Sequence, residues 1–299
     1  MRKTTTLLFG LPAALLATAG IATGAGPGTT RLVDVPTGFA APFDGVNDSS
    51  VGQNRAISAN GRYVVFTSSS DGLVAGGADD NATHCYRRDL QTGQTVLVDR
   101  ASGPDGPISS AGCGQVTISP DGSAVAYESS ASNLVPDDPP DTQDVFVRMV
   151  DAGVTFRASV DSAGTGVNGA MFGISLTVTP AVNVVAGPTV HVVFATDATL
   201  DPADPPAQKR FDVYIHRAHP FTTSVLTQNP TFLISRGNGP ASPASTGSQP
   251  SVSADGNRVA FMTDASLDAA DTGADLDVYL RDINAATTTL VSRADGTAG

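Results

Sequence analysis

Four segments of the chain align with one another without gaps and decide its fold. They are HCYRRDL from His84, DVFVRMV from Asp144, DVYIHRA from Asp212 and DVYLRDI from Asp277. Their starts are separated by 60, 68 and 65 residues. Each segment alternates β-branched or aromatic residues with others, which is typical of a β-strand. The chain therefore repeats a unit of about 60 to 70 residues.

Each unit contains three further predicted strands. The strands upstream of the aligned segments are RYVVFTS from Arg62, SAVAYES from Ser123, VHVVFAT from Val190 and RVAFMTD from Arg258. Three of them follow the turns SANG (58–61), SPDG (119–122) and SADG (253–256), whose Asn-Gly and Asp-Gly pairs tolerate the positive φ of a tight hairpin. A short strand precedes each turn, and TVLVDR, TFRASV, TFLISR and TTLVSR form the fourth strands. In the third unit TPA (179–181) and the insertion AVNVVAGPT replace the turn.

Apolar side chains on both faces of the second strand predict how the units pack. Tyr63 and Val65 point to one side of the strand, and Val64 and Phe66 point to the other. Neither face can be left in water, and stacking the units radially buries both. The sequence therefore predicts an all-β protein, a β-propeller of four-stranded antiparallel blades, with repeats at about 58–110, 111–170, 171–245 and 246–299. A two-sheet sandwich is the rival architecture, although its strands usually expose one face.

These repeats resemble a known family. The S-x-D-G turn, the apolar strand after it, the acidic loop, D-V-[FY]-x-R-D and T-G-x-T are similar to TolB-like (WD-like) bacterial propeller repeats. The resemblance covers most of residues 58–299. The resemblance implies a protein-binding or scaffold role in the cell envelope. The family also includes propellers that are attached to peptidase domains.

One predicted strand precedes the first complete repeat. The segment TTRLVDV (29–35) resembles the fourth strand of a unit, yet the last unit already has its own fourth strand. Four complete repeats plus this orphan strand predict an open or incomplete ring with apolar blade faces at both ends. Such a chain is either a fragment of a longer propeller or associates with itself through those faces. A self-sufficient four-bladed ring is the alternative.

The N-terminus predicts export. Arg2 and Lys3 precede an apolar stretch from Leu7 to Ala19, and small residues follow up to Ala25, which is the layout of a secretory signal. We assign residues 1–25 to this signal peptide and 26–57 to an N-terminal strand and linker. The rest contains no second apolar segment long enough to span a membrane. The mature chain is expected to be secreted or to lie in the periplasm or cell envelope.

The net charge of the chain limits the classes of partner that it is expected to bind. The formal net charge is −12, because 17 Lys and Arg residues face 29 Asp and Glu residues. Nucleic acid and anionic membrane surfaces are disfavoured by this charge. The acidity favours cations or basic partners instead, and the sequence does not identify the partner.

Catalytic motifs are mostly missing from the sequence. Serine hydrolase chemistry needs a nucleophile turn and a histidine, and no G-x-S-x-G is present. The four histidines lie in or beside predicted strands. A glycosidase-like hydrolase using Asp residues at the central channel is the strongest enzymatic alternative, since two carboxylates suffice for that reaction. The chain has no Trp on which sugar rings commonly stack.

The acidic loops before the third strands are the candidate metal site. Several carboxylates within one short loop offer the oxygen ligands that calcium prefers, and the alternative is that they cap backbone amides in ordinary turns. No loop matches the full EF-hand pattern, and no cofactor other than calcium is suggested. The candidate ligands are Asp137, Asp141, Asp144, Asp268, Asp271, Asp275 and Asp277.

Cys85 and Cys113 are the only cysteines of the chain. In an exported protein such a pair predicts a disulfide, and two free thiols are the alternative because Val fills the equivalent position of Cys85 in the other units. Together, these features favour an exported, non-enzymatic propeller that binds proteins or acts as a scaffold. The propeller hydrolase remains the alternative.

Overall fold

The computed structural model describes residue 33 and residues 49–52, 55–77, 80–136, 138, 142–166, 169–179, 187–204, 210–221, 229–239 and 245–294, with the backbone alone at residue 172. The predicted signal peptide and the predicted strand at 29–35, apart from Val33, lie outside these residues. All strands described below belong to one compact unit, Leu32–Gly299.

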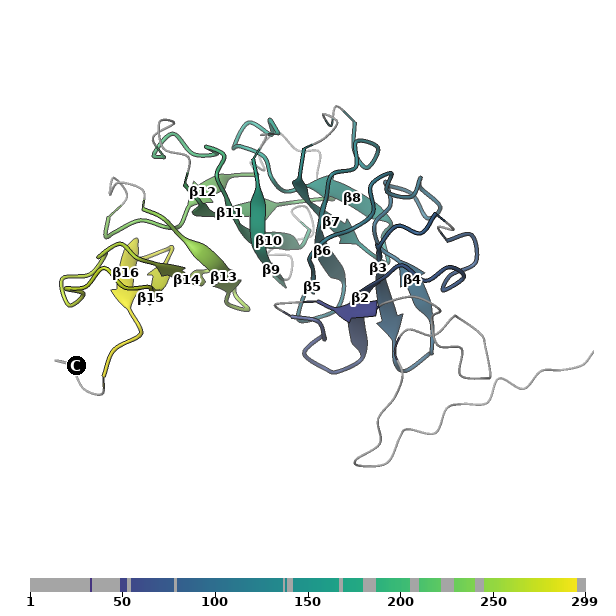
Figure 1. Ribbon diagram of the computed structural model, residues 1–299, viewed down its shortest axis with the longest axis horizontal. Helices are drawn as coiled ribbons and strands as arrows, with labels where there is room; N and C mark the ends of the chain where they lie inside the picture. Colours follow the sequence, from purple (N-terminus) through teal and green to yellow (C-terminus); the bar gives the residue numbers. More distant parts are fainter. Residues whose placement is uncertain are drawn as a thin grey trace, which may run out of the picture. The chain divides into compact units, whose positions relative to one another are not determined.

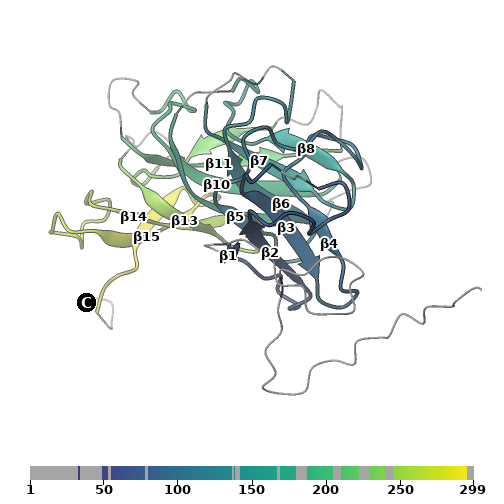
Figure 2. The same cartoon turned by 45° about the vertical axis from the view of Figure 1, so that its right-hand side comes forward.

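In the described residues, sixteen β-strands form four antiparallel sheets, and no helix is present (Figures 1 and 2). The first sheet contains β1 (Ser49–Val51), β2 (Tyr63–Ser68), β3 (His84–Asp89) and β4 (Thr95–Leu97), and the second contains β5 (Val116–Ile118), β6 (Ala124–Ser129), β7 (Asp144–Met149) and β8 (Val154–Arg157). The third contains β9 (Met171–Thr179), β10 (Thr189–Thr196), β11 (Asp212–Ala218) and β12 (Thr231–Leu233), and the fourth contains β13 (Ser248–Val252), β14 (Arg258–Thr263), β15 (Asp277–Asp282) and β16 (Thr287–Leu290). Neighbouring strands in each sheet follow chain order. The predicted all-β fold of four four-stranded units is confirmed.

The first sheet begins earlier than the turn-based reading of the sequence placed it. Ile57, next to the tight turn, forms only an isolated bridge with Val64. The ladder continues at β1, where Val51 pairs with Phe66. The first strand of this sheet, β1, therefore lies within residues 26–57, the segment assigned to a strand and linker.

The three predicted tight turns share one hydrogen-bond pattern. The hydroxyls of Ser58, Ser119 and Ser253 each donate to the Asn or Asp side chain two residues later. Each hydroxyl also accepts a hydrogen bond of 3.0 Å from the backbone N–H five residues later. The glycine that ends each turn has φ between 70° and 79°, a conformation that favours glycine. These turns start the second strand of three sheets in the same way.

An aromatic pair in each sheet organises the packing between sheets. The two rings come from the second and third strands, with centroids 5.5 to 6.4 Å apart, and the pairs are Phe66–Tyr86, Tyr127–Phe146, Phe194–Tyr214 and Phe261–Tyr279. Tyr127 and Phe146 of the second sheet pack with Val65 and Val98 of the first. The pairs of the third and fourth sheets likewise pack on aliphatic side chains of the sheets before them. Sheet faces therefore stack on sheet faces, as a propeller requires.

A buried arginine on the third strand holds the connection from the preceding sheet. The guanidinium of Arg148 donates to the hydroxyl of Thr155 and to the carbonyl oxygens of Arg100, Ala101 and Gly103, at 2.8 to 3.2 Å. Arg281 of the fourth sheet donates to carbonyl oxygens of Gly237 and Gly239 in the same manner. Because connecting backbone carbonyls need donors when they are buried, this arginine is part of the fold's framework.

We predict that Arg148→Met lowers the free energy of unfolding by about 2 to 4 kcal/mol, because the carbonyl groups of the connection lose their donor. Arg258→Met is the matched control, since Arg258 is exposed and makes a surface ion pair with Asp282 at 3.2 Å. Its effect should stay within about 0.5 kcal/mol. Urea denaturation of both variants measures the difference, and equal losses would contradict the assigned role of Arg148.

Candidate functional site

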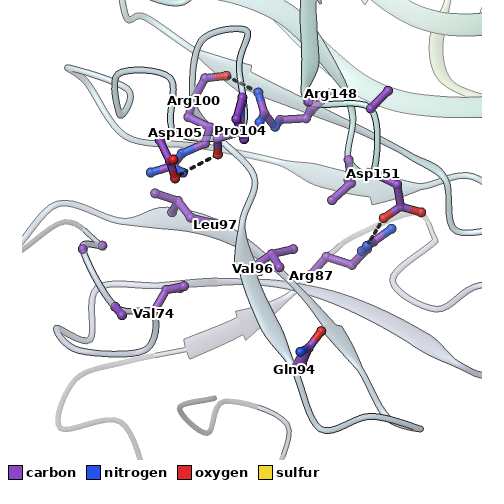
Figure 3. Close-up of a pocket in the computed structure, with 16 residues that line it drawn as sticks. Val74, Arg87, Gln94, Val96, Leu97, Arg100, Pro104, Asp105, Arg148 and Asp151 are labelled. Atoms are coloured by element: carbon purple, nitrogen blue, oxygen red, sulfur yellow. Dashed lines mark hydrogen bonds and ion pairs between the residues drawn. The ribbon is translucent and has the colours of Figure 1, made fainter. Parts of the chain in front are cut away.

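A groove with a volume of 590 Å³ lies between the first and second sheets. The first sheet supplies β3, β4 and the loop 74–77, and the second sheet supplies Arg148 and the turn 150–153. The connection between the sheets, at residues 100–105, forms a further wall. Aliphatic side chains line part of the groove, and Figure 3 shows Val74, Val96 and Leu97 among the charged groups.

Three arginines line this groove (Figure 3). Arg87 donates to Asp151 at 2.6 Å and to the carbonyl oxygen of Gly122 at 2.8 Å. Arg100 donates to the carbonyl oxygen of Pro104 at 3.0 Å. The Nε atoms of Arg87 and Arg100 are buried and have no hydrogen-bond partner among the described residues. Two of the three guanidinium groups therefore contain a buried N–H donor that is unpaired among the described residues.

The carboxylates beside these arginines are open to solvent. The side chain of Asp151 is 72% exposed, and that of Asp105 is 97% exposed and lies 3.9 Å from Arg100. Burial, together with the nearby charge of Arg100, lowers the pKa of Arg148. Three arginines against two exposed aspartates make this groove a locally basic site on a chain whose net charge is −12.

A second groove, of 450 Å³, occupies the equivalent place between the second and third sheets. Here His216 stands where Arg148 stands in the first groove, and Val160 replaces Arg100. His216 bonds the hydroxyl of Thr231 at 2.9 Å, and burial lowers its pKa to about 4. The remaining arginine, Arg157, is paired with Asp138 at 2.6 Å. Of these two grooves, only the first is lined by three guanidinium groups.

The sequence analysis did not single out the first groove. Its signal is Arg87, which occupies a position on the third strand where the other repeats carry Val147, Ile215 and Leu280. An arginine at a position that is aliphatic in the other three repeats departs from the apolar packing that those repeats share. The sequence alone does not show the role of Arg87, because its partners, Asp151 and Gly122, belong to the next sheet.

The acidic loop before β15 acts as a set of turn caps. Asp268 accepts hydrogen bonds from the backbone N–H groups of Ala270 at 3.0 Å and Leu290 at 3.4 Å. Asp271 accepts from the N–H of Gly273 at 3.0 Å and from the hydroxyl of Tyr279. Asp277 accepts from the hydroxyl of Ser292 at 2.6 Å, and Asp275 is exposed.

The candidate metal ligands of the second sheet are only partly described. Asp144 is buried, accepts hydrogen bonds from Thr142 at 2.9 Å and Ser159 at 2.6 Å, and lies 3.6 Å from Arg157. Asp137 and Asp141 lie outside the described residues. The described residues contain no group of three or more His, Cys, Asp or Glu side chains that could hold a metal ion. Calcium binding therefore stays a prediction.

A polar side-chain pair recurs in three of the sheets, and in the first sheet other residue types replace both of its members. In the other sheets an aspartate at the start of the third strand bonds a serine after the fourth, as in Asp144–Ser159. In the first sheet His84 bonds Asp99 at 2.7 Å, and the N–H of Cys85 donates to the same carboxylate at 2.9 Å. Burial opposes protonation of His84, but Asp99 and Asp80 outweigh it and raise its pKa. The histidine is thus accounted for by the framework.

The structure joins the sulfur atoms of Cys85 and Cys113, whose Cα atoms lie 5.6 Å apart. Cys85 lies on β3, and Cys113 lies just before β5, so this contact crosses from the first sheet to the second. In the described residues, no helix is long and apolar enough to cross a membrane.

No family model matches the chain, and no curated protein matches its sequence. The solved structures that it resembles are TolB-like β-propellers. TolB from Acinetobacter baumannii is 12% identical, with a TM-score of 0.42, and the match covers 82% of this chain and 43% of that one. A putative TolB from Agrobacterium tumefaciens is 13% identical, with a TM-score of 0.42 and coverages of 83% and 63%. An oligogalacturonate lyase from Vibrio parahaemolyticus is 12% identical, with a TM-score of 0.38 and coverages of 83% and 54%.

This chain spans about half the length of the solved structures that it matches. At this identity and TM-score the similarity assigns neither an activity nor a partner to the chain. The groove between the first and second sheets is therefore interpreted from its own residues.

We predict that non-reducing peptide mapping of the exported protein recovers the peptides of Cys85 and Cys113 as one linked species. The bond would close a loop of 28 residues, and it should contribute about 2 to 4 kcal/mol to the free energy of unfolding. The double variant Cys85→Ala/Cys113→Ala, compared with the oxidised protein in urea, measures this contribution. Two thiols that alkylate in the native protein would contradict the disulfide.

Calcium, if it binds at the acidic loops before Asp144 and Asp277, raises the melting temperature by mass action. Melting the protein in excess calcium and in chelator checks this expectation. Asp275→Asn is the informative variant, because Asp275 is exposed and the turn-capping bonds described above come from Asp268 and Asp271. Equal melting midpoints in calcium and chelator would leave these aspartates as turn caps alone.

Proposed function

We propose that this chain is a binding propeller of the cell envelope or secreted space, and that its basic groove takes a carboxylate-bearing segment of a partner protein. The basic groove is the cavity between the first and second sheets, lined by Arg87, Arg100 and Arg148. The observation that carries the proposal is the convergence of these three arginines beside aliphatic side chains on an acidic chain.

A carboxylate suits the guanidinium groups of the groove. Guanidinium groups bind carboxylates through paired N–H donors, and such charge-assisted bonds are stronger than neutral ones. Asp105, the carboxylate nearest Arg100, is exposed and 3.9 Å away, so an incoming carboxylate displaces little.

The aliphatic lining favours a protein segment over a small anion. Val74, Leu97 and Val150 lie around the same groove as the guanidinium groups. A site with apolar walls and a few charged groups gains affinity from apolar contact and orientation from the charges. The expected ligand is therefore a short peptide segment in which an Asp, a Glu or a terminal carboxylate adjoins an aliphatic residue.

The proposed location rests on the sequence. The basic and apolar pattern of residues 1–25 favours export, and a disulfide between Cys85 and Cys113 would suit an oxidising compartment. A propeller hydrolase that uses Asp residues at the central channel stays the alternative.

The test uses fluorescent peptides in which an acidic residue adjoins two aliphatic residues, each paired with a twin that carries Gln or Asn instead. We expect the protein to prefer the carboxylate peptides about tenfold, which corresponds to about 1.4 kcal/mol. Arg100→Gln should abolish this preference, whereas Arg258→Gln, on the exposed surface of β14, should keep it. Equal binding of the twins, or a preference that survives Arg100→Gln, would refute the proposed role of the groove.

A further inference from the structure

Arg87 and Asp151 face each other in the basic groove and form an ion pair between two neighbouring sheets (Figure 3). Both residues occupy positions where their own repeat differs from the others. The residues aligned with Arg87 are aliphatic, namely Val147, Ile215 and Leu280. The residues aligned with Asp151 carry no carboxylate, and they are Gln91, His219 and Asn284. Two departures from the repeat therefore meet at one place in the groove.

Contacts that do not involve Asp151 fix the guanidinium group of Arg87. Its Nη1 atom donates to the carbonyl oxygen of Gly122 at 2.8 Å. Its central carbon lies 4.5 Å from the centroid of the Tyr63 ring, which is within the range of a cation–π contact. A Cβ atom at position 122 would overlap this ring, so the close approach requires glycine. The guanidinium group is therefore held in place independently of Asp151.

Asp151 is held on Arg87 by its side chain alone. The Nη2 atom of Arg87 donates to Oδ1 of Asp151 at 2.6 Å. The side chain of Arg87 is only 8% exposed, whereas that of Asp151 is 72% exposed. The turn that carries Asp151 is fixed separately, because the N–H of Gly103 donates to the carbonyl oxygen of Gly153 at 2.7 Å. The carboxylate can therefore leave Arg87 by rotation of its own side chain, without a change in the backbone.

An exposed carboxylate is a weak competitor for a guanidinium group. Water screens its charge, and the side chain loses rotational freedom in the pair, so such pairs contribute little free energy. The carboxylate of a peptide brings, in addition, apolar contact with Leu97 and Val150 of the groove wall. A peptide with both features therefore has an advantage over Asp151 at the same guanidinium group.

We propose that Asp151 is an internal competitor of the ligand, which occupies Arg87 in the free protein and is replaced there by the carboxylate of the bound peptide. This inference rests on the proposed function, because it assigns the regulation of the same groove. Asp151 raises the affinity that a ligand needs, so a segment without a carboxylate does not displace it. A purely structural ion pair predicts the opposite effect, since loss of Asp151 would leave Arg87 without its partner and weaken the groove.

Asp151→Asn tests this inference, because it removes the charge and keeps the size of the side chain. We expect it to bind the carboxylate peptides about threefold to fivefold more tightly than the wild type, and to bind their amide twins with unchanged affinity. Asp105→Asn is the matched control. Asp105 lines the same groove and is exposed, but it lies 3.9 Å from Arg100, too far for a hydrogen bond. Its gain should stay below about 1.5-fold, which is the general effect of removing one negative charge.

A double-mutant cycle assigns the gain to Arg87. In the Arg87→Gln background, Asp151→Asn should give no further gain in affinity, because the group for which the two carboxylates compete is gone. Anisotropy titrations of the four proteins measure the affinities, and thermal melting confirms that each variant is folded. Asp151→Ser replaces Asp151→Asn if the latter is destabilised. A gain that persists without Arg87 would contradict the competition.

The outcomes separate this inference from the proposed function. A wild type that binds the carboxylate peptides and their twins equally would refute both. If the wild type prefers the carboxylate peptides, yet Asp151→Asn binds them no more tightly than Asp105→Asn does, the ion pair is structural and only the competition is refuted.

Discussion

The structure depends on one packing relation, in which the aromatic pair of a sheet lies on the aliphatic face of the sheet before it. Large rings on the second and third strands bury much of their surface in this way, and apolar burial is the main favourable contribution to folding. The second sheet shows the result most clearly, since all residues of β6 and β7 are buried. Such strands cannot stand alone, because both of their faces need a neighbour. The buried arginines then hydrogen-bond the segments that connect neighbouring sheets, and the serine turns stabilise the hairpins before the second strands.

Much of this architecture could be predicted from the sequence because it is repeated. The D-V-[FY]-x-R segments gave the third strands, and the S-x-D-G turns set the hairpins before the second strands. The first strand of the first sheet was harder to place, since only Ile57 bridges next to the turn and pairing resumes at Ser49–Val51. A ladder interrupted in this way leaves no alternating pattern in the sequence. The predictions on residues 1–25 and 29–35 lie outside the described residues, apart from Val33.

The candidate site shows where reading single segments fails. The aspartates of the acidic loop are close in sequence, yet Asp268 accepts a hydrogen bond from Leu290 of β16, and Asp271 accepts one from Tyr279 of β15. A carboxylate that already accepts two or three hydrogen bonds has fewer lone pairs left to coordinate a cation. Conversely, Arg87, Arg100 and Arg148 are scattered in the sequence and meet only because two sheets pack together. No local sequence pattern indicates that these arginines converge. In a repeat protein, such a site is found instead by looking for positions where one repeat carries a residue type that the others lack.

The proposed binding groove arises where the repeat departs from its own packing pattern. Arg87 replaces an aliphatic residue of the third strand, so a guanidinium group lines the groove between the first and second sheets. The groove between the second and third sheets has His216 and Val160 at the positions of Arg148 and Arg100, and the arginine that lines it, Arg157, is paired with Asp138. Selection for packing alone would favour an aliphatic residue at position 87, because an unpaired buried donor costs stability. The proposed contact of the groove with a carboxylate ligand explains a residue that packing within the fold does not.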